Sequence, residues 1–559
     1  MPHQFYDTHR ETLERSLTAI RDRGYWSPYP EIPKAYPEEA PAEGERAFQA
    51  YLGRRFPLDQ PGTDDWIATE RSPYGIELGV EYPHQDLGRA MASGLDAMPA
   101  WTAAGAETRA GVCLEILHRL NARTFELAHA AMHTTGQAYM MAFQAAGTHA
   151  QDRGLEAVAY AYAEMTRLPA EAYWEKPQGR RPPLRLRKRF HVVPRGLALL
   201  VACNTFPTWN SYPGLFASLV TGNAVLVKPH PRAVLPLAIT VAVAREVLAE
   251  AGFSPDLVTL VPERDGEALA TTLATNPAVR IVDFTGSKAY GNWLEEHARQ
   301  AQVYTEKSGV NTIVVESTDD FAGMCRNIAF TLSLYAGQMC TTPQNIVLPR
   351  DGVDTDEGHK SADEVASGIA QAVDTLLSDD ARAAEVLGAI VNEAVLDRLE
   401  HAGGTGRTLL GSRVVKHPKF PDAVVRTPHL AVVEPADPAL TSECFGPVTY
   451  VTTAEDAAAA VSMLATTSHD QGAITASFYS TKEEVLDDAV DAAIAGGVHL
   501  SCNLTGGVYM NQTAAFSDFH ATGANPAANA SLVDGAFVAG RFRVVEVRRH
   551  AEPEGAGDA

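Results

Sequence analysis

The chain has 559 residues, of which 45% are hydrophobic, and a formal net charge of −23. A chain of this length and apolar content buries two or three substantial cores, and its acidity disfavours nucleic acids and anionic membranes as partners. These properties predict a globular protein with a small-molecule partner.

Neither a membrane span nor a disulfide scaffold is expected. No stretch approaches the roughly 18 apolar residues of a spanning helix, and the N-terminal residues lack a cationic segment followed by an apolar run, so we expect a cytoplasmic location. The cysteines are far apart and form no C-x-x-C pair, which predicts reduced thiols and no metal site. They are Cys113, Cys203, Cys325, Cys340, Cys444 and Cys502.

The first third of the chain is expected to be largely helical. Residues 1–64 form an N-terminal extension with a short polar helix and a stretch rich in proline and aromatic residues, and the sequence assigns it no role. The sequence from about 88 to 134 is alanine-rich, and Gly136 is a plausible stop for its helices.

After Pro194 the predicted elements alternate between strand and helix. The helix predicted over 235–251 ends at Gly252, with a proline beyond. Apolar runs predict short strands at 197–202, 224–227, 257–261 and 279–284. Strands flanked by helices favour a parallel sheet buried on both faces, with its ligand crevice at the carboxyl ends of the strands. We therefore expect a Rossmann-like cofactor domain over 65–305.

A second α/β domain is expected over 306–505, because the alternation repeats there. Its predicted strands lie at 312–316, 345–349 and 476–480. The cleft between the two domains is the natural place for an active site.

Two further segments are predicted to be exposed strands. Alternating side chains mark the basic segment 183–193, inserted in the cofactor domain, and the segment 537–549, within a C-terminal segment spanning 506–559. Such strands need a partner, in this chain or in a second subunit. They predict a β oligomerisation arm and a homodimer or homotetramer.

Cys340 and Glu306 are the candidate catalytic residues. Cys340 lies in A-G-Q-M-C-T-T-P, where Gly337 permits an unusual backbone, and Glu306 lies in Y-T-E-K-S-G. A lone cysteine is usually an inert core residue, since a nucleophile needs a depressed pKa, and a lone glutamate is usually a solvated charge. The surrounding motifs must decide between these interpretations.

The motifs occur in a specific order. Glu306 precedes Cys340 by 34 residues, and G-N-A-V-L-V-K-P (222–229), F-T-G-S (284–287) and E-C-F-G-P-V (443–448) accompany the pair. Together, over roughly residues 66–550, these motifs resemble those of the aldehyde dehydrogenase superfamily. The resemblance implies cofactor binding at Lys228, Gly286, Ser287, Gly291, Glu443 and Phe445.

The resemblance also implies a fold and a mechanism. The fold is α/β and aldehyde dehydrogenase-like, with a Rossmann-like domain, a second α/β domain and the β arm. In the mechanism, the Cys340 thiolate attacks the aldehyde, hydride passes to the nicotinamide, and Glu306 activates the water that hydrolyses the thioester. The thiol needs a proton acceptor or an electropositive field, and either Glu306 or the bound cofactor can supply it.

The oxyanion donor departs from the family pattern. The family places an asparagine two residues before a proline, whereas this chain reads C-N-T-F-P, with Pro207 at the family's distance of 21 residues from Lys228. Thr205 therefore fills the asparagine position, and Asn204 stands one residue early. Asn204 is favoured because an amide is the better oxyanion donor, with Thr205 as the alternative.

The choice of dinucleotide is the second departure. Many NAD-preferring members carry a glutamate three residues after the lysine, but here that position is Pro231, followed by Arg232. Loss of the carboxylate and gain of a guanidinium favour NADP over NAD, although Arg232 can equally be a solvated surface residue.

The variant motifs and the long extension resemble the branch of the family that acts in aromatic-acid catabolism. That resemblance implies a semialdehyde carried on coenzyme A after ring cleavage, oxidised to the acid. Two alternatives remain: a coenzyme A-acylating dehydrogenase, which needs no water-activating base, and an inactive member that serves as a scaffold or ligand-binding protein.

Overall fold

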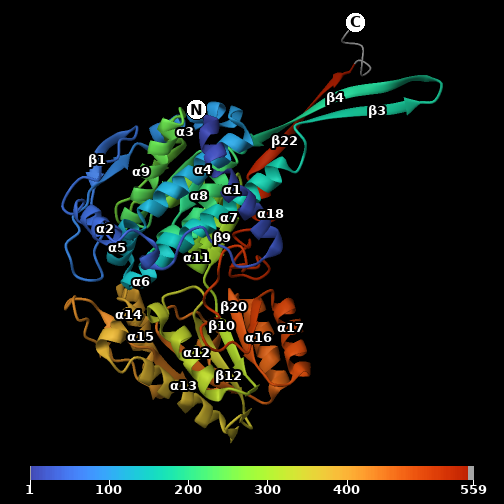
Figure 1. Ribbon diagram of the computed structural model, residues 1–559. Coiled ribbons are helices and arrows are strands. Elements are labelled where there is room, and N and C mark those ends of the chain that lie inside the picture. The colour runs from blue at the N-terminus through green and yellow to red at the C-terminus, as the bar shows by residue number, and fades with distance from the viewer. Residues whose placement is uncertain (1, 552–559) are drawn as a thin grey trace.

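Two sheets, one in each half of the molecule, organise the structure. The computed structural model describes residues 2–551, so residues 552–559 of the predicted C-terminal segment lie outside the described residues. A body built on a five-stranded sheet lies above a body built on a seven-stranded sheet, and a three-stranded arm projects from the upper body (Figure 1).

The five-stranded sheet is parallel, as its apolar strands predict. Its order is β7-β6-β5-β8-β9, with β5 (Leu197–Val201), β6 (Val225–Lys228), β7 (Val258–Leu260), β8 (Val279–Gly286) and β9 (Gln302–Lys307). The predicted helix is α9 (Leu235–Glu250), and Gly252 follows it with a φ of 81°. Because the strands are parallel, their carboxyl ends lie on the same side of the sheet, and Lys228, Gly286 and Glu306 lie together there.

The seven-stranded sheet is parallel except at one edge, where β15 runs antiparallel to β18. Its order is β15 (Arg407–Leu410), β18 (His429–Val432), β19 (Val448–Ala454), β12 (Pro343–Pro349), β10 (Asn311–Val315), β20 (Thr475–Tyr479) and β21 (His499–Cys502). The strands predicted in this half correspond to β10, β12 and β20. Helices α12 (Phe321–Ser333), α13 (Ala362–Leu376), α16 (Ala457–Gln471) and α17 (Glu483–Gly496) accompany the sheet.

Helices from the first third of the chain pack around the upper sheet. They are α3 (Leu87–Ala103), α4 (Gly105–Ala122), α5 (Thr124–Thr135), α7 (Ala150–Thr166) and, from the cofactor half, α8 (Pro207–Val220). The break after α5 lies at Gly136, whose φ is 79°. No helix among the described residues is both long and apolar enough to cross a membrane.

The N-terminal extension is part of this packing. Helix α1 (Pro2–Asp22) contacts α4 and α7, and α2 (Ala40–Gln49) contacts α5. Leu13 and Phe48 are only 2% and 3% exposed and belong to the main hydrophobic core. Burying such side chains favours an ordered extension, at roughly 1.5–3 kcal/mol for each large apolar group.

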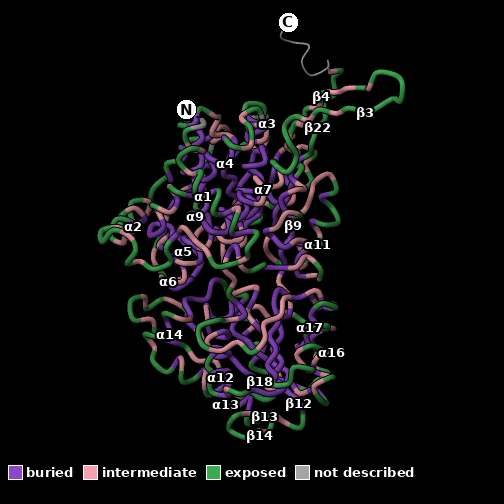
Figure 2. The backbone as a smooth tube through the Cα atoms, turned by 45° about the vertical axis from the view of Figure 1, so that its right-hand side comes forward, coloured by how far each residue is buried: buried purple, intermediate pink, exposed green. Residues whose placement is uncertain are grey.

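In the arm, the two predicted exposed strands pair with each other, together with a third strand that the sequence did not predict. β4 (Arg181–Pro194) lies between β3 (Glu171–Gln178) and β22 (Phe542–His550), with Phe542 opposite Pro194. Figure 2 shows the arm as largely exposed, in contrast to the buried strands of the two bodies. The last strand begins later than the sequence predicts, because Gly535–Ala539 form a short helix, α18.

Candidate active site

The loop that carries Cys340 has an unusual backbone. After α12, Tyr335, Ala336 and Gly337 adopt φ values of 54°, 50° and 64°. A Cβ added to Gly337 would come 2.4 Å from the carbonyl oxygen of Gly446. The glycine therefore allows the Cys340 loop to lie directly against the segment E-C-F-G-P-V.

Asn311 fixes the same loop from the other side. Its Nδ2 donates to the carbonyl oxygens of Cys340, at 2.8 Å, and Thr342, at 3.0 Å. Its Oδ1 accepts from the backbone N–H groups of Ile474 and Thr475. One amide side chain thus holds the nucleophile loop against β10 and β20, which limits the motion of the thiol.

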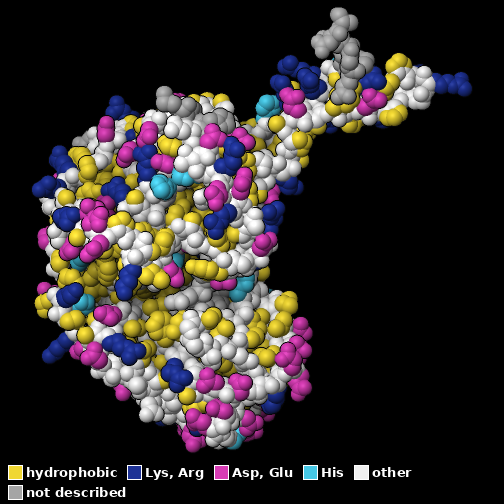
Figure 3. Space-filling model, viewed as in Figure 1, with side chains coloured by type: hydrophobic (Ala, Val, Ile, Leu, Met, Phe, Trp, Pro, Cys, Tyr) yellow, Lys and Arg dark blue, Asp and Glu magenta, His cyan; other side chains and the backbone are white. Residues whose placement is uncertain are grey.

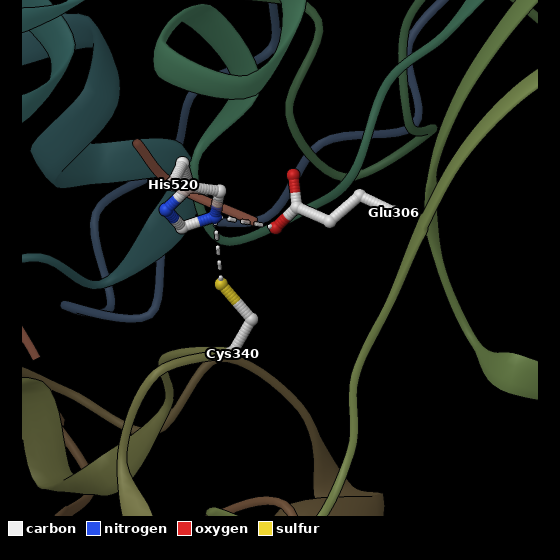
Figure 4. Close-up of side chains that lie close together, drawn as sticks. All are labelled: Glu306, Cys340 and His520. Carbon is white, nitrogen blue, oxygen red and sulfur yellow. Dashed lines mark hydrogen bonds and ion pairs between the residues drawn. The ribbon is translucent and has the colours of Figure 1, made fainter. Parts of the chain in front are cut away.

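Glu306 faces Cys340 from the end of β9, and its side chain is completely buried. Nδ2 of Asn210, on α8, donates to its Oε2 at 2.8 Å. Nε2 of His520 lies 2.9 Å from its Oε1 and 3.7 Å from Sγ of Cys340 (Figure 4). Three elements distant in sequence therefore converge on the carboxylate and the thiol.

The environment shifts the pKa values of both groups. Burial alone would raise the pKa of Glu306, but the interaction with His520 and hydrogen bonds from His520, Cys340 and Asn210 outweigh it and lower that pKa. Burial, and then the neighbouring Glu306, raise the pKa of the Cys340 thiol well above its usual range. At rest the pair is a carboxylate beside a thiol, which suits transfer of the thiol proton to the carboxylate.

Glu263, which the sequence analysis did not single out, lies at the carboxyl end of the five-stranded sheet, where the cofactor is expected. Lys228, at the end of β6, forms an ion pair with Glu263, which follows β7. Burial lowers the pKa of Lys228, against the effect of this partner. Arg232 lies beside His230, whose pKa falls to about 4 through burial and then through the charges of Lys228 and Arg232. An ammonium beside a carboxylate offers the donor and acceptor that a ribose diol needs.

The predicted phosphate loop follows β8. Ser287 begins α11 (Lys288–His297) and its Oγ accepts from the backbone N–H of Tyr290 at 3.4 Å. A Cβ at Gly291 would come 2.5 Å from Cγ of Lys307, and one at Gly286 would come 2.7 Å from the Phe284 ring. Packing within the chain therefore accounts for both glycines, and the helix terminus at Ser287 remains suited to a phosphate.

Glu443 and Phe445 line the same pocket as Cys340. This pocket also includes residues of the loop before β12. Burial raises the pKa of Glu443, opposed by Ser308 and by the charges of Arg398 and Lys288. The space-filling view shows the surface indented where the two bodies meet (Figure 3). The residues that line this pocket all belong to the second half of the chain, between Gly309 and Val448, and its polar groups fit a nicotinamide dinucleotide.

The two candidate oxyanion residues lie in the turn between β5 and α8. Both are half-buried. Nδ2 of Asn204 donates to the carbonyl oxygen of Thr134 at 3.4 Å, and the carbonyl oxygen of Thr205 accepts from Gln137. The Asn204 bond is long, so its amide loses little by turning toward another acceptor.

Sequence analysis missed Asn210, His520 and Glu263. Asn210 stands three residues after Pro207, and His520 lies in a loop more than 200 residues beyond Glu306. The ligand atoms of Glu306, Cys340 and His520 lie within 4.8 Å of one another, a spacing that would also suit a metal ion. The hydrogen bonds of His520 to Glu306 and Cys340 account for this spacing.

Two comparisons with known proteins match most of the chain. Residues 80–525 match the model of the aldehyde dehydrogenase family. A crystal structure of NAD-dependent aldehyde dehydrogenase from Burkholderia multivorans is 54% identical, with a TM-score of 0.97, and the alignment covers 99% of this chain and 100% of that one.

Curated relatives are more distant. A 1-pyrroline-5-carboxylate dehydrogenase of Anoxybacillus flavithermus is 23% identical, over 83% of this chain and 88% of that protein. A vanillin dehydrogenase of Amycolatopsis is 27% identical, over 67% of this chain and 72% of that protein.

Proposed function

The chain belongs to the aldehyde dehydrogenase family, and on that premise we propose that it oxidises a semialdehyde carried on coenzyme A to the free carboxylic acid. It is an NAD(P)-dependent aldehyde dehydrogenase. The observation that carries the proposal is the buried carboxylate of Glu306 beside the thiol of Cys340. A base in that position can serve the thiol first and water later.

The first half of the reaction forms a covalent bond to Cys340. Its thiolate attacks the carbonyl carbon, and the charge that develops on oxygen is stabilised by the Cys340 backbone N–H and the Asn204 amide, with Thr205 as the alternative. A bound nicotinamide dinucleotide supplies the hydride acceptor. Cys340 then carries the acyl group as a thioester.

The second half releases the acid. Glu306, held by Asn210 and His520, first releases the thiol proton to solvent and then takes a proton from water, which attacks the thioester carbon and frees the Cys340 sulfur as a thiolate. A coenzyme A-acylating enzyme needs no such base, and the assembled thiol and carboxylate also disfavour an inactive scaffold. Product analysis separates these functions: acyl-CoA formed from aldehyde and free coenzyme A would exclude hydrolysis as the main route.

NAD⁺ is the proposed dinucleotide. The sequence favours NADP⁺ because Pro231 replaces the family glutamate and Arg232 follows. The Lys228–Glu263 ion pair restores a carboxylate from the neighbouring strand, and a 2′-phosphate at this edge would be repelled by it. The solved structure that is 54% identical is also named NAD-dependent.

An aromatic-catabolic substrate is supported by sequence features. The motif E-K-S-G-V-N after the base, G-Q-M-C-T around the nucleophile and the long N-terminal extension resemble the phenylacetic acid degradation protein PaaN. The relative from Amycolatopsis is named for the aromatic aldehyde vanillin. The test is a spectrophotometric screen of free and coenzyme A-linked semialdehydes with NAD⁺ and NADP⁺; equal rates with short aliphatic aldehydes would contradict the assignment.

A homodimer or homotetramer is proposed from the arm. The residues Val544, Val545 and Val547 on β22 are 41%, 49% and 37% exposed, which is unusual for apolar groups on an edge strand. A second copy of the chain would cover them. Light scattering on the purified protein tests this, and a monomer at micromolar concentration would contradict it.

A further inference from the structure

His520 lies between the two reacting groups, although it belongs to a loop outside the family motifs. Its imidazole is 4% exposed, and one nitrogen, Nε2, serves both neighbours: Oε1 of Glu306 at 2.9 Å and Sγ of Cys340 at 3.7 Å (Figure 4). In a triad of the serine-protease kind, the nucleophile and the carboxylate contact different ring nitrogens. Here a single N–H can face either group, but not both fully at once.

The surroundings of the second ring nitrogen, Nδ1, indicate which nitrogen of the imidazole carries the proton. Nδ1 is buried and has no hydrogen-bond partner among the described residues. A proton there would leave a buried N–H unsatisfied, at about 1–3 kcal/mol, whereas a bare lone pair is less costly. The geometry therefore places a proton on Nε2, from which the ring acts as a hydrogen-bond donor.

We propose that His520 is a catalytic residue whose Nε2–H follows the negative charge between Glu306 and Cys340, in the reaction proposed above. At rest it donates to the Glu306 carboxylate. When the S–H bond breaks, the proton forms an O–H bond on Glu306, the electron pair stays on sulfur, and the Nε2–H turns to the thiolate. Charge-assisted hydrogen bonds of this kind are about twice as strong as neutral ones, so the donor stabilises whichever group is charged.

The loop around His520 is anchored by buried charges. Arg153, on α7, donates to the carbonyl oxygen of Asp518 and to Oγ1 of Thr513, each at 3.1 Å. Its partner Glu156 accepts from the backbone N–H of Phe516 at 3.0 Å. These contacts hold the loop at residues only a few positions before His520. A ring that donates to two neighbours in turn must be held in a fixed place, and these contacts provide that.

The N-terminal extension holds the same loop from outside. Arg23 donates to the carbonyl oxygen of Ser517 at 3.0 Å, and its guanidinium lies 4.0 Å from the centre of the Phe519 ring. The rings of Trp26 and Phe516 meet edge to face, with centres 5.0 Å apart. The extension, to which the sequence assigns no role, therefore positions His520.

The titratable groups that face the imidazole come from three elements. They are Glu306 on β9, Cys340 in the nucleophile loop and His499 on β21. An experiment on His520 must therefore separate the loss of a donor from the loss of an ionisable ring. Glutamine does so, because its amide N–H occupies about the position of Nε2 but does not titrate in the working range.

The test compares His520→Gln with His520→Leu. The readouts are the rate of Cys340 alkylation by iodoacetamide between pH 6.5 and 10, and kcat/KM. We expect the leucine variant to lose at least about tenfold in alkylation at neutral pH and to shift its profile to higher pH, and the glutamine variant to stay within about threefold of the parent protein. Dinucleotide binding and the thermal midpoint report on folding.

Two outcomes would overturn the proposal: an unchanged alkylation profile in the leucine variant, or a glutamine variant as impaired as the leucine variant while still folded. Alkylation needs no aldehyde, so it is independent of the substrate assignment. Arg23→Gln should shift the profile in the same direction by a smaller amount, with the exposed Arg21→Gln as the control. Equal profiles for these two variants would exclude positioning of His520 by the extension.

Discussion

Asn210 donates a hydrogen bond of 2.8 Å to Oε2 of Glu306, while His520 lies 2.9 Å from Oε1 of the same carboxylate. The two oxygens of the base thus have separate partners, one from α8 and one from the loop before α18. This division fixes the plane of the carboxylate and keeps its charge stabilised where no solvent reaches it.

Asn210→Leu should slow release of the acid. Removing a donor to a buried carboxylate costs about 1.5–3 kcal/mol, so we expect a 10- to 100-fold fall in the hydrolytic rate. Because the lost bond lowers the pKa of Glu306, that pKa rises in the variant and the loss is largest at acidic pH. Rapid-mixing kinetics should show a burst of reduced dinucleotide; a burst-free time course with an unchanged steady-state rate would contradict the assignment.

Alkylation of Cys340 should require alkaline pH in the protein without ligand. Burial and then Glu306 raise the pKa of the thiol, so the thiolate fraction near neutrality is lower than that of a free cysteine, whose pKa is about 8.5. The iodoacetamide rate should therefore still rise above about pH 9, and Cys340→Ser identifies the labelled residue by mass spectrometry. A plateau below about pH 8 would mean that the thiol is already activated.

Glu263→Gln should change the dinucleotide preference. Neutralising this partner of Lys228 removes a carboxylate that repels a 2′-phosphate and leaves the ammonium free to bind it. We expect the ratio of kcat/KM for NAD⁺ to that for NADP⁺ to fall at least about tenfold, which corresponds to about 1.4 kcal/mol. Asp265→Asn, a nearby acidic residue without an ion pair among the described residues, is the control. Equal ratios in all three proteins would place the phosphate elsewhere.

The oxyanion assignment can be tested by paired variants. Asn204→Ala removes the amide donor, and Thr205→Val removes a hydroxyl while keeping the side-chain shape. Loss of an oxyanion donor costs about 10²–10³ in kcat, so one variant should lose that much and the other little. The proposed role of Asn204 fails if only Thr205→Val is impaired.

Periodicity and motif order predicted the sheets because parallel strands buried on both faces are continuous apolar runs, as in β5 and β12. The strand end that carries Lys228 followed from the same pattern, whereas β9, which carries Glu306, was not predicted as a strand, because Q-V-Y-T-E-K is not a continuous apolar run. His520, Asn210 and Glu263 did not follow from the pattern, since their roles depend on tertiary contacts between segments far apart in the chain. A histidine in a loop has no periodicity, and the Arg153 anchor that places it is visible only in three dimensions.

Gly337→Ala should lower kcat by more than its backbone strain explains. Gly53→Ala is the control, because it introduces the same kind of strain away from the active site. Both glycines have positive φ, 64° and 67°, so each alanine costs about 1–2 kcal/mol of backbone strain. Only at Gly337 would the new Cβ meet another group, the Gly446 carbonyl at 2.4 Å, whereas nothing lies within 4 Å at Gly53.

The clash at Gly337 separates the nucleophile loop from the segment of Glu443 and Phe445. A displacement near 1 Å costs about 10²-fold in rate, so kcat should fall by about that factor in Gly337→Ala alone. Thermal midpoints and kcat for both variants check this, and parallel losses in the two would show that strain, not the contact with Gly446, explains the glycine.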